Sequence, residues 1–376
     1  MRTLFAALLV SYSITAVAAA APMPPAPTLA ARSWILVDQA NGRMLAGHDV
    51  DARVEPASLT KLMTAYAVFH ALREGKFKLD TAFPISERAW RSEGSRTYLD
   101  LNTRVPVEVL IQGMIVQSGN DATIALAEAV GGTEDTFAGL MNQYAERLGM
   151  NGSHFENSTG LPGPNHRMTV ADIARLTRAI IREFPDYYRW YSQREFTWNN
   201  IWQPNRNGLL QRDPTVDGVK TGMTDAAGYC LVSSAKRNGM RLVAVVMGTK
   251  DTNAREEASL ALLNYGFSFF ETRVLQKART EIAKHRVYKA RGGRAAVGIA
   301  EDLVVTLPRG QADRVEFKLE LAPRVFAPLT VSDRVGIMRA IVDGKVVAEA
   351  PLQPVADVPR GNIFRRIWDT ILSWFA

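Results

Sequence analysis

The hydrophobic pattern of the chain changes near residue 285, and this change limits the possible folds more than any other feature. Before it, over residues 33–275, stretches with helical spacing are mixed with short strand-like runs. After it, apolar and polar residues alternate, as in residues 314–321. A period of two indicates a strand with one buried face, whereas spacings of three and four indicate a helix. We therefore predict an α+β domain followed by a small all-β domain.

The first domain, predicted over residues 22–284, carries signals for both helices and strands. Asn-Gly pairs between apolar runs predict two β-hairpins, one turning at Asn41-Gly42 and one at Asn238-Gly239. Apolar residues at helical spacing predict helices over residues 58–72, 107–116, 121–130, 169–183 and 255–269. Strands near both ends of this domain, around a helical middle, favour an antiparallel sheet with a helical cluster.

The second domain, predicted over residues 285–356, reads as strands only. Turn signals at Pro308-Arg309-Gly310 and at Asp343-Gly344 separate its apolar runs. We expect a small β-sandwich-like domain without chemistry of its own.

The N-terminus, residues 1–21, has the pattern of a secretory signal peptide. Arg2 precedes a short apolar run that ends in four alanines and is followed by prolines. The alternative is an uncleaved membrane helix, which the shortness of the apolar run disfavours. We therefore expect an exported protein. The single cysteine, Cys230, fits a fold that does not depend on disulfides.

The C-terminus, residues 357–376, predicts an amphipathic helix. Its apolar residues recur at helical spacing, and Arg365, Arg366 and Asp369 lie mostly opposite them. The segment is too short and too charged to span a bilayer, which takes about 20 apolar residues. A basic helix with tryptophans suits a membrane interface, so we predict a membrane anchor. The alternative is a terminal helix packed on the protein's own core.

The formal net charge is +7, from 45 Lys and Arg against 38 Asp and Glu. Such a balance fits nucleic acid, an anionic membrane or an acidic polymer. The basic residues form no recognisable nucleic-acid module, and export removes the usual nucleic-acid partners. We therefore expect a membrane and an acidic polymer as partners, and no nucleic acid.

The sequence predicts no metal site, because it has one cysteine and its histidines lack the spacing of a helical metal-binding pair.

The first chemical motif is Ser58-Leu59-Thr60-Lys61, at the start of a predicted helix. A spacing of three places hydroxyl and amine on one helix face. A lysine can activate a serine when burial or neighbouring charges lower its pKa, and the helix N-terminus offers N–H groups to an oxyanion. The motif alone is weak, because Ser233 and Lys236 repeat it at a predicted strand end, which we interpret as a surface turn.

A second motif, Ser118-Gly119-Asn120, interrupts two predicted helices. Ser118 can pass a proton between a base and a leaving group, and the Asn120 amide can hold a substrate amide. Taken alone, Ser118 is better explained as a helix cap.

A third motif, Lys220-Thr221-Gly222, lies on a predicted strand, where Lys220 and Gly222 share one face and Thr221 points to the other. Gly222 lets a substrate backbone approach closely, and the Lys220 charge can hold an acid or tune the serines. Taken alone, this motif is a strand end with solvated side chains.

Together, S-x-x-K, S-x-N and K-T-G in this order and separation are the pattern of serine β-lactamases and penicillin-binding proteins. With residues 157–161, 205–210 and 217–229, the sequence resembles the low-molecular-mass penicillin-binding proteins of the D-alanyl-D-alanine carboxypeptidase type, peptidase family S11. The resemblance covers nearly the whole chain. It implies a β-lactamase/transpeptidase-like catalytic domain, a small β domain and a C-terminal amphipathic anchor.

The resemblance implies a serine hydrolase that removes the terminal D-alanine from peptidoglycan pentapeptide stems. Ser58 would form an acyl-enzyme, with substrate or with β-lactams, and Lys61 would accept its proton. Ser118 and Lys220 would pass a proton to the leaving amine. No metal or organic cofactor is implied. The enzyme would work in the periplasm, attached peripherally to the outer face of the cytoplasmic membrane.

The remaining implied residues bind substrate. Asn120 would orient the peptide beside Gly222, Thr221 and Arg255 would bind the terminal carboxylate, and the N–H groups of Ser58 and Met223 would form the oxyanion hole. Arg255 matches only by its place before the last predicted helix of the first domain.

Two positions depart from the family pattern. Met223 stands where many relatives carry histidine, and Thr159 stands where some do. Loss of both imidazoles would slow deacylation or change the substrate preference.

A class A β-lactamase is the nearest rival, but Gly119 replaces the aspartate of its S-D-N motif, and Glu156 lacks the Leu-Asn that follows the loop glutamate. A D-Ala-diaminopimelate endopeptidase of the same family and a non-catalytic wall-binding protein are two further possibilities.

Overall fold

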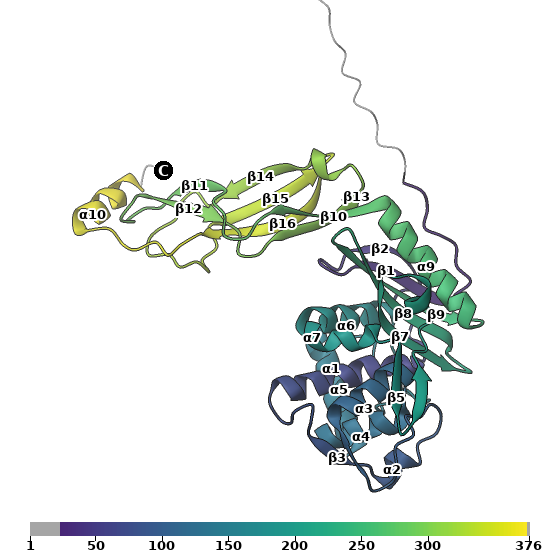
Figure 1. Ribbon diagram of the computed structural model, residues 1–376. Coiled ribbons are helices and arrows are strands. Elements are labelled where there is room, and N and C mark those ends of the chain that lie inside the picture. The colour runs from purple at the N-terminus through teal and green to yellow at the C-terminus, as the bar shows by residue number, and fades with distance from the viewer. Residues whose placement is uncertain (1–22, 374–376) are drawn as a thin grey trace, which may run out of the picture.

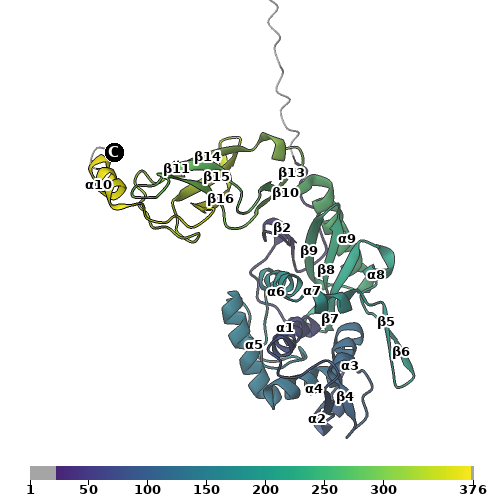
Figure 2. The ribbon, with the colours of Figure 1, turned by 60° about the vertical axis from the view of Figure 1, so that its left-hand side comes forward.

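The computed structural model describes residues 23–373, so the predicted signal peptide over residues 1–21 lies outside the described residues. An α+β part is followed by a β part, which extends away from it as an arm and ends in the helix α10 (Figures 1 and 2).

The α+β part is built on a five-stranded antiparallel sheet. Its strand order is β2-β1-β9-β8-β7, with bounds β1 Ser33–Asp38, β2 Met44–His48, β7 Val216–Thr224, β8 Gly228–Arg237 and β9 Met240–Thr249. Both predicted Asn-Gly hairpins are therefore present, as β1–β2 and β8–β9. Because β7 is an edge strand, its outer side is open to contacts other than sheet pairing.

Both faces of this sheet are buried. Ile35 and Val37 of β1 belong to the core on one side, whereas Trp34 and Leu36 belong to the core on the other side. The first core is filled by a helical cluster, and the second is closed by α9, Thr252–Phe269 (Figure 1). The alternation along β1 therefore separates two apolar layers rather than an apolar from a wet face.

The helical cluster consists mainly of α1 Lys61–Arg73, α4 Asn120–Gly131, α5 Glu134–Leu148 and α6 Val170–Glu183. Helix α1 runs through the cluster and buries 11 of its 13 residues, as expected of a helix that is apolar nearly all round. Helix α6 begins where the sequence predicts, since the Thr169 side chain accepts a hydrogen bond from Asp172 N. The shorter elements are η1 Ala57–Thr60, β3 Ala82–Pro84, α2 Glu87–Trp90, β4 Arg104–Pro106, α3 Val107–Gln112, η2 Gly113–Gln117, α7 Pro185–Tyr188, η3 Arg189–Ser192, β5 Glu195–Trp198, β6 Ile201–Pro204 and α8 Leu209–Arg212.

The β part contains a two-stranded and a five-stranded sheet. The first pairs β10 Phe270–Gln276 with β13 Leu303–Pro308. The second has the order β11-β12-β16-β15-β14, with bounds β11 Ala283–Arg286, β12 Arg294–Gly298, β14 Glu316–Leu321, β15 Gly336–Val342 and β16 Lys345–Pro354, and the short η4 spans Ala312–Arg314. Strand β10 precedes the expected change at residue 285, yet it pairs with β13 of the β part. Side chains from β12, β15 and β16 meet in a separate apolar core.

Polar contacts join the two parts at the β1–β2 turn. Asn41 Nδ2 donates to Thr306 Oγ1 at 2.9 Å, and the Thr272 hydroxyl donates to the buried Asp38 carboxylate. Asp38 also caps the turn by accepting Ala40 N at 2.8 Å. One carboxylate thus shapes the hairpin turn and fixes the base of the arm.

Helix α10, Ile363–Leu372, turns its only acid inward and apolar side chains outward. Asp369 is buried and accepts Lys289 N at 2.6 Å, with Arg286 and Arg365 at 3.6 and 3.4 Å. Phe364 and Trp368, in contrast, are 79% and 61% exposed. No helix within residues 23–373 has both the length and the apolar character to cross a bilayer.

Candidate active site

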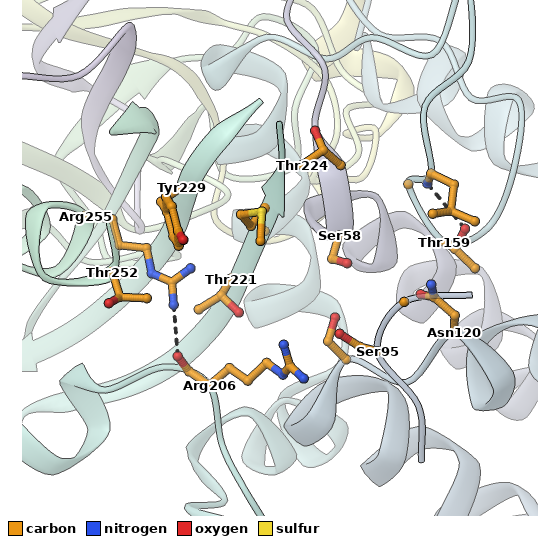
Figure 3. A pocket seen from close by; sticks show the side chains of 16 residues that line it. Ser58, Ser95, Asn120, Thr159, Arg206, Thr221, Thr224, Tyr229, Thr252 and Arg255 are labelled. Carbon is orange, nitrogen blue, oxygen red and sulfur yellow. Dashed lines mark hydrogen bonds between the residues drawn. The ribbon is translucent and has the colours of Figure 1, made fainter. Parts of the chain in front are cut away.

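A pocket between the edge strand β7 and the helical cluster collects the residues that the sequence singled out (Figure 3). Its lining includes all but two of the predicted site residues, namely Ser58, Ser118, Asn120, Thr221, Gly222, Met223 and Arg255. The other two, Lys61 and Lys220, lie buried beneath it, and each contacts one of the two serines.

The first motif spans the junction of η1 and α1. Ser58 lies in the 3-10 turn, and Lys61 is the first residue of the α-helix. In a 3-10 turn side chains three residues apart are eclipsed, which brings Lys61 Nζ to 2.9 Å from Ser58 Oγ. The sequence predicted a helix from residue 58, and the tighter turn at its start explains the close pairing.

The Lys61 amine has three hydrogen-bond partners. Its Nζ donates to Asn120 Oδ1 at 2.7 Å and to the Thr159 carbonyl at 2.8 Å, and the Ser58 hydroxyl is its third neighbour. Burial, together with the charge of Arg206, lowers the pKa of Lys61 to about 7. As an ammonium, Lys61 donates to all three neighbours. In its neutral form, two N–H groups can serve the two carbonyl oxygens, which leaves the lone pair for the Ser58 hydroxyl. This arrangement can take a proton from Ser58.

Ser118 and Lys220 form a second hydroxyl–amine pair at the pocket. Ser118 ends the π-helical turn η2 in a left-handed conformation, with φ at 66°, and Lys220 Nζ donates to its Oγ at 2.9 Å. A non-glycine residue in this conformation often marks a functional site. Burial and the nearby charge of Lys61 hold the pKa of Lys220 well below its ordinary value.

The glycine of the second motif is required by packing. A Cβ on Gly119 would lie 2.0 Å from Thr97 Oγ1 and 2.8 Å from Thr97 N. The aspartate of an S-D-N motif could not enter here without displacing the segment around Thr97. Asn120, next in sequence, is tied down by Lys61 and by its own Nδ2, which donates to the Glu93 carbonyl at 2.6 Å.

Strand β7 forms the other wall of the pocket. Gly222 passes close to η1, because a Cβ there would lie 3.1 Å from the Pro56 carbonyl oxygen. Thr221 lines the pocket although it alternates with Lys220 along the strand. The sequence predicted opposite faces for these two side chains, and both serve the site because the pocket runs along a sheet edge. Met223 is exposed at the rim.

Two arginines lie at the far end of the pocket. Arg255 near the start of α9 donates to the Arg206 carbonyl oxygen at 3.2 Å, and its buried Nε has no hydrogen-bond partner (Figure 3). The Arg206 side chain also lines the pocket, and burial lowers the pKa of both guanidinium groups. Among the described residues that line the pocket none is acidic. Such a site favours an anion.

A tight loop, residues 157–160, closes the pocket beside Lys61. Asn157 Oδ1 accepts the N–H groups of Thr159 and Gly160, and Gly160 has φ of +86°. A Cβ on Gly160 would lie 1.8 Å from the Ala57 carbonyl oxygen, so this position is limited to glycine. The loop presents the Thr159 carbonyl, rather than the Thr159 side chain, to Lys61.

Sequence reasoning missed Arg206 as a site residue, together with Ser95 and the Thr159 carbonyl. Arg206 stands in a stretch that contributed only to the family resemblance, and an isolated arginine in a polar loop has no sequence signal of its own. The second S-x-x-K, in contrast, is not a site, and it is not a surface turn either: it lies on β8, where Ser233 is fully buried and Lys236 is exposed.

Comparison with known proteins agrees with this geometry. A family model described as D-alanyl-D-alanine carboxypeptidase, peptidase S11, matches residues 17–251, and a model of the C-terminal domain of penicillin-binding protein 5 matches residues 270–360. The curated D-alanyl-D-alanine carboxypeptidase DacA of Escherichia coli K12 is 39% identical over 361 residues, which cover 94% of this chain and 90% of that protein. DacC of the same strain is 40% identical and covers 93% and 92% of the two chains.

Solved structures give the same result. Penicillin-binding protein 5 from Haemophilus influenzae superposes with a TM-score of 0.86 at 40% identity, covering 90% of this chain and 100% of that one. Penicillin-binding protein D2 from Listeria monocytogenes, in its ampicillin-bound form, has a TM-score of 0.60 at 28% identity and covers 65% and 100%. The chain belongs to the D-alanyl-D-alanine carboxypeptidases of peptidase family S11, serine-type hydrolases of the penicillin-binding protein class.

Proposed function

We propose that this D-alanyl-D-alanine carboxypeptidase removes the terminal D-alanine of peptidoglycan pentapeptide stems through an acyl-enzyme on Ser58. The observation that carries the proposal is the Lys61 amine, 2.9 Å from Ser58 Oγ, with its two other neighbours in place as acceptors. The same serine would be acylated by β-lactams. An endopeptidase or β-lactamase activity is not favoured by the relatives, which carry the carboxypeptidase name.

In the first step Ser58 Oγ attacks the carbonyl carbon of the penultimate D-alanine while its proton passes to Lys61. The N–H groups of Ser58 and Met223, both residues of the pocket lining, would hold the negative oxygen. The C–N bond then breaks. Ser118 gives a proton to the departing amine and is reprotonated through Lys220 by Lys61, which returns to its neutral form. Water finally attacks the ester carbon and gives a proton to Lys61, and Ser58 Oγ takes that proton back as the shortened stem is released.

The arginine end of the pocket would receive the terminal carboxylate. Arg255 and the Thr221 hydroxyl are the groups that the family resemblance implies, and we add Arg206 because its side chain enters the same space (Figure 3). Asn120 and Gly222 would orient the peptide between the helical cluster and β7.

Deacylation would proceed without an imidazole. Met223 and Thr159 replace histidines of relatives, and no histidine is among the described lining residues. The nearby His166 is buried behind the motif, with its Nε2 2.8 Å from Thr60 Oγ1, and burial lowers its pKa to about 4. We therefore assign the activation of water to Lys61 and Ser118.

The enzyme would act outside the cytoplasm, on the cell wall, as its penicillin-binding relatives imply. We propose that residues 1–21 direct export and that α10 attaches the protein peripherally to the outer face of the cytoplasmic membrane. The exposed Phe364 and Trp368 support this, as do Arg365 and Arg366 beside them.

Mass spectrometry after incubation with a penicillin tests the assignment of the nucleophile. The wild type should carry one penicilloyl group on the peptide that contains Ser58, and Ser58→Ala should carry none. Ser233→Ala is the matched control, because Ser233 belongs to the second S-x-x-K and its buried hydroxyl has no hydrogen-bond partner. An adduct that persists in Ser58→Ala would refute the assignment.

A further inference from the structure

We propose that Glu134, at the start of α5, is a positioning residue for the reaction, because it fixes the Thr159 carbonyl against Lys61 and adds a negative charge behind that amine. This inference rests on the proposed role of Lys61 as the base.

Glu134 is buried, and its carboxylate has hydrogen bonds on both oxygens. Oε1 accepts the Ser158 hydroxyl at 2.6 Å and Ser158 N at 3.0 Å, and Oε2 accepts two N–H groups of Arg88. Burial alone raises the pKa of a carboxyl group, but the bonds from Ser158 and Arg88 hold the pKa of Glu134 below its ordinary value. The group is therefore an anion in the interior.

Helix capping does not explain this anion. Thr133 already caps α5, since its hydroxyl oxygen accepts Thr136 N. The hydrogen bonds of the Glu134 carboxylate lead to Ser158 and Arg88 and not to the N–H groups of its own helix. The acid is thus bound to the loop that closes the pocket.

Hydrogen bonds of Ser158 and Thr159 connect Glu134 to Lys61. The Ser158 carbonyl accepts the Thr64 hydroxyl at 2.7 Å, and the carbonyl of the next residue, Thr159, accepts Lys61 Nζ at 2.8 Å. Lys61 and Thr64 lie one turn apart on α1, so residues 158–159 follow the helix. Glu134 holds the same segment through the Ser158 hydroxyl and N–H. If the segment shifts, Lys61 loses the acceptor that directs its lone pair at Ser58.

The negative charge of Glu134 is the second component of the proposal, beside its hold on the Thr159 carbonyl. The charged groups that act on Lys61 are Asp121 and Glu134, which raise its pKa, and Arg206, which lowers it; Lys220 is also coupled to Lys61. Loss of the Glu134 charge must lower the pKa of Lys61. The acid limb of the rate profile, where Lys61 becomes protonated, then moves to lower pH.

Glu134→Gln tests both components in the full-length enzyme, with kcat/KM for a D-Ala-D-Ala peptide measured against pH. We expect an acid limb about 0.5–1 pH unit lower, by Coulomb interaction across the interior, and a plateau reduced roughly tenfold by the misdirected amine. Ser158→Ala keeps the charge, so it should reduce the plateau with little shift of the limb. Glu128→Gln is the matched control, because it removes the same charge from a carboxylate that accepts the Ser86 hydroxyl rather than Ser158.

Active enzyme is counted by penicillin titration, which corrects for misfolded protein. An unmoved limb in Glu134→Gln overturns the inference, whether or not the plateau falls, since a merely structural role changes the rate but not the pKa. An unchanged plateau in both Glu134→Gln and Ser158→Ala overturns it as well. Penicillin labelling of Ser58→Ala separates this failure from that of the proposed nucleophile.

Discussion

The pKa of Lys61 makes a quantitative prediction about the rate of acylation. With a pKa of about 7, roughly 3% of the enzyme holds the neutral amine at pH 5.5 and roughly 97% at pH 8.5. A solvated lysine, with a pKa near 10.4, would be neutral in only about 0.04% of molecules at pH 7. Burial therefore raises the fraction of competent base at neutral pH about a thousandfold.

The expected result is an acylation rate constant that rises about tenfold per pH unit below pH 7 and levels off above it. Stopped-flow acylation by nitrocefin is a suitable assay, because the carboxylate of the reagent does not titrate between pH 5.5 and 8.5. His166, whose pKa is lowered to about 4, stays neutral in this window and does not shape the limb.

Lys61→Arg serves as the companion variant, since a guanidinium group stays protonated throughout and should abolish the limb together with nearly all acylation. Lys236→Arg, in the second S-x-x-K, should behave as wild type. A profile that is flat between pH 5.5 and 8.5, or that rises only above pH 9, would refute the argument that burial prepares Lys61 as the base.

Three further predictions concern the loop, the arginines and the anchor. Gly160→Ala should cost about 3 kcal/mol or more of unfolding free energy in urea, because the Cβ would overlap a backbone oxygen at positive φ, whereas Gly75→Ala, at φ of +73° in open space, should cost about 1 kcal/mol; equal costs would contradict the packing argument. Arg206→Gln and Arg255→Gln should each raise KM for a D-Ala-D-Ala peptide tenfold or more with a smaller change in kcat, by loss of a charged hydrogen bond; an unchanged KM in both would show that the carboxylate binds elsewhere. Truncation after Pro359 should leave activity on soluble pentapeptide intact and release the protein from vesicles that contain anionic lipid, as a flotation assay would show; a truncated protein that stayed bound would exclude α10 as the anchor.

The sequence predicted those elements whose signals are local. Asn-Gly turns located the hairpins β1–β2 and β8–β9, and Thr169 located the start of α6, because turn and cap chemistry depends on adjacent residues. The three motifs located five residues of one pocket and the two lysines beneath it, since their chemistry is tied to short spacings, whereas Met223 and Arg255 followed from the family resemblance.

Other features depend on contacts that are distant in the sequence. The left-handed Ser118 and the requirement for Gly119 arise from packing against Thr97. Glu134 meets Ser158 only after α5 docks beside the closing loop, and Arg206 reaches the pocket from a loop without regular structure. Polar residues in such loops have no period or motif that would reveal their partners.

The most direct test of the proposed activity is the mass analysis of muropeptides with pentapeptide stems after incubation with the purified enzyme. We expect that each stem loses a single alanine, that crosslinked dimers stay intact, and that Ser58→Ala leaves the pentapeptides unchanged. Pentapeptide stems that the wild type leaves intact, or dimers that it splits without trimming pentapeptides, would contradict the proposed activity.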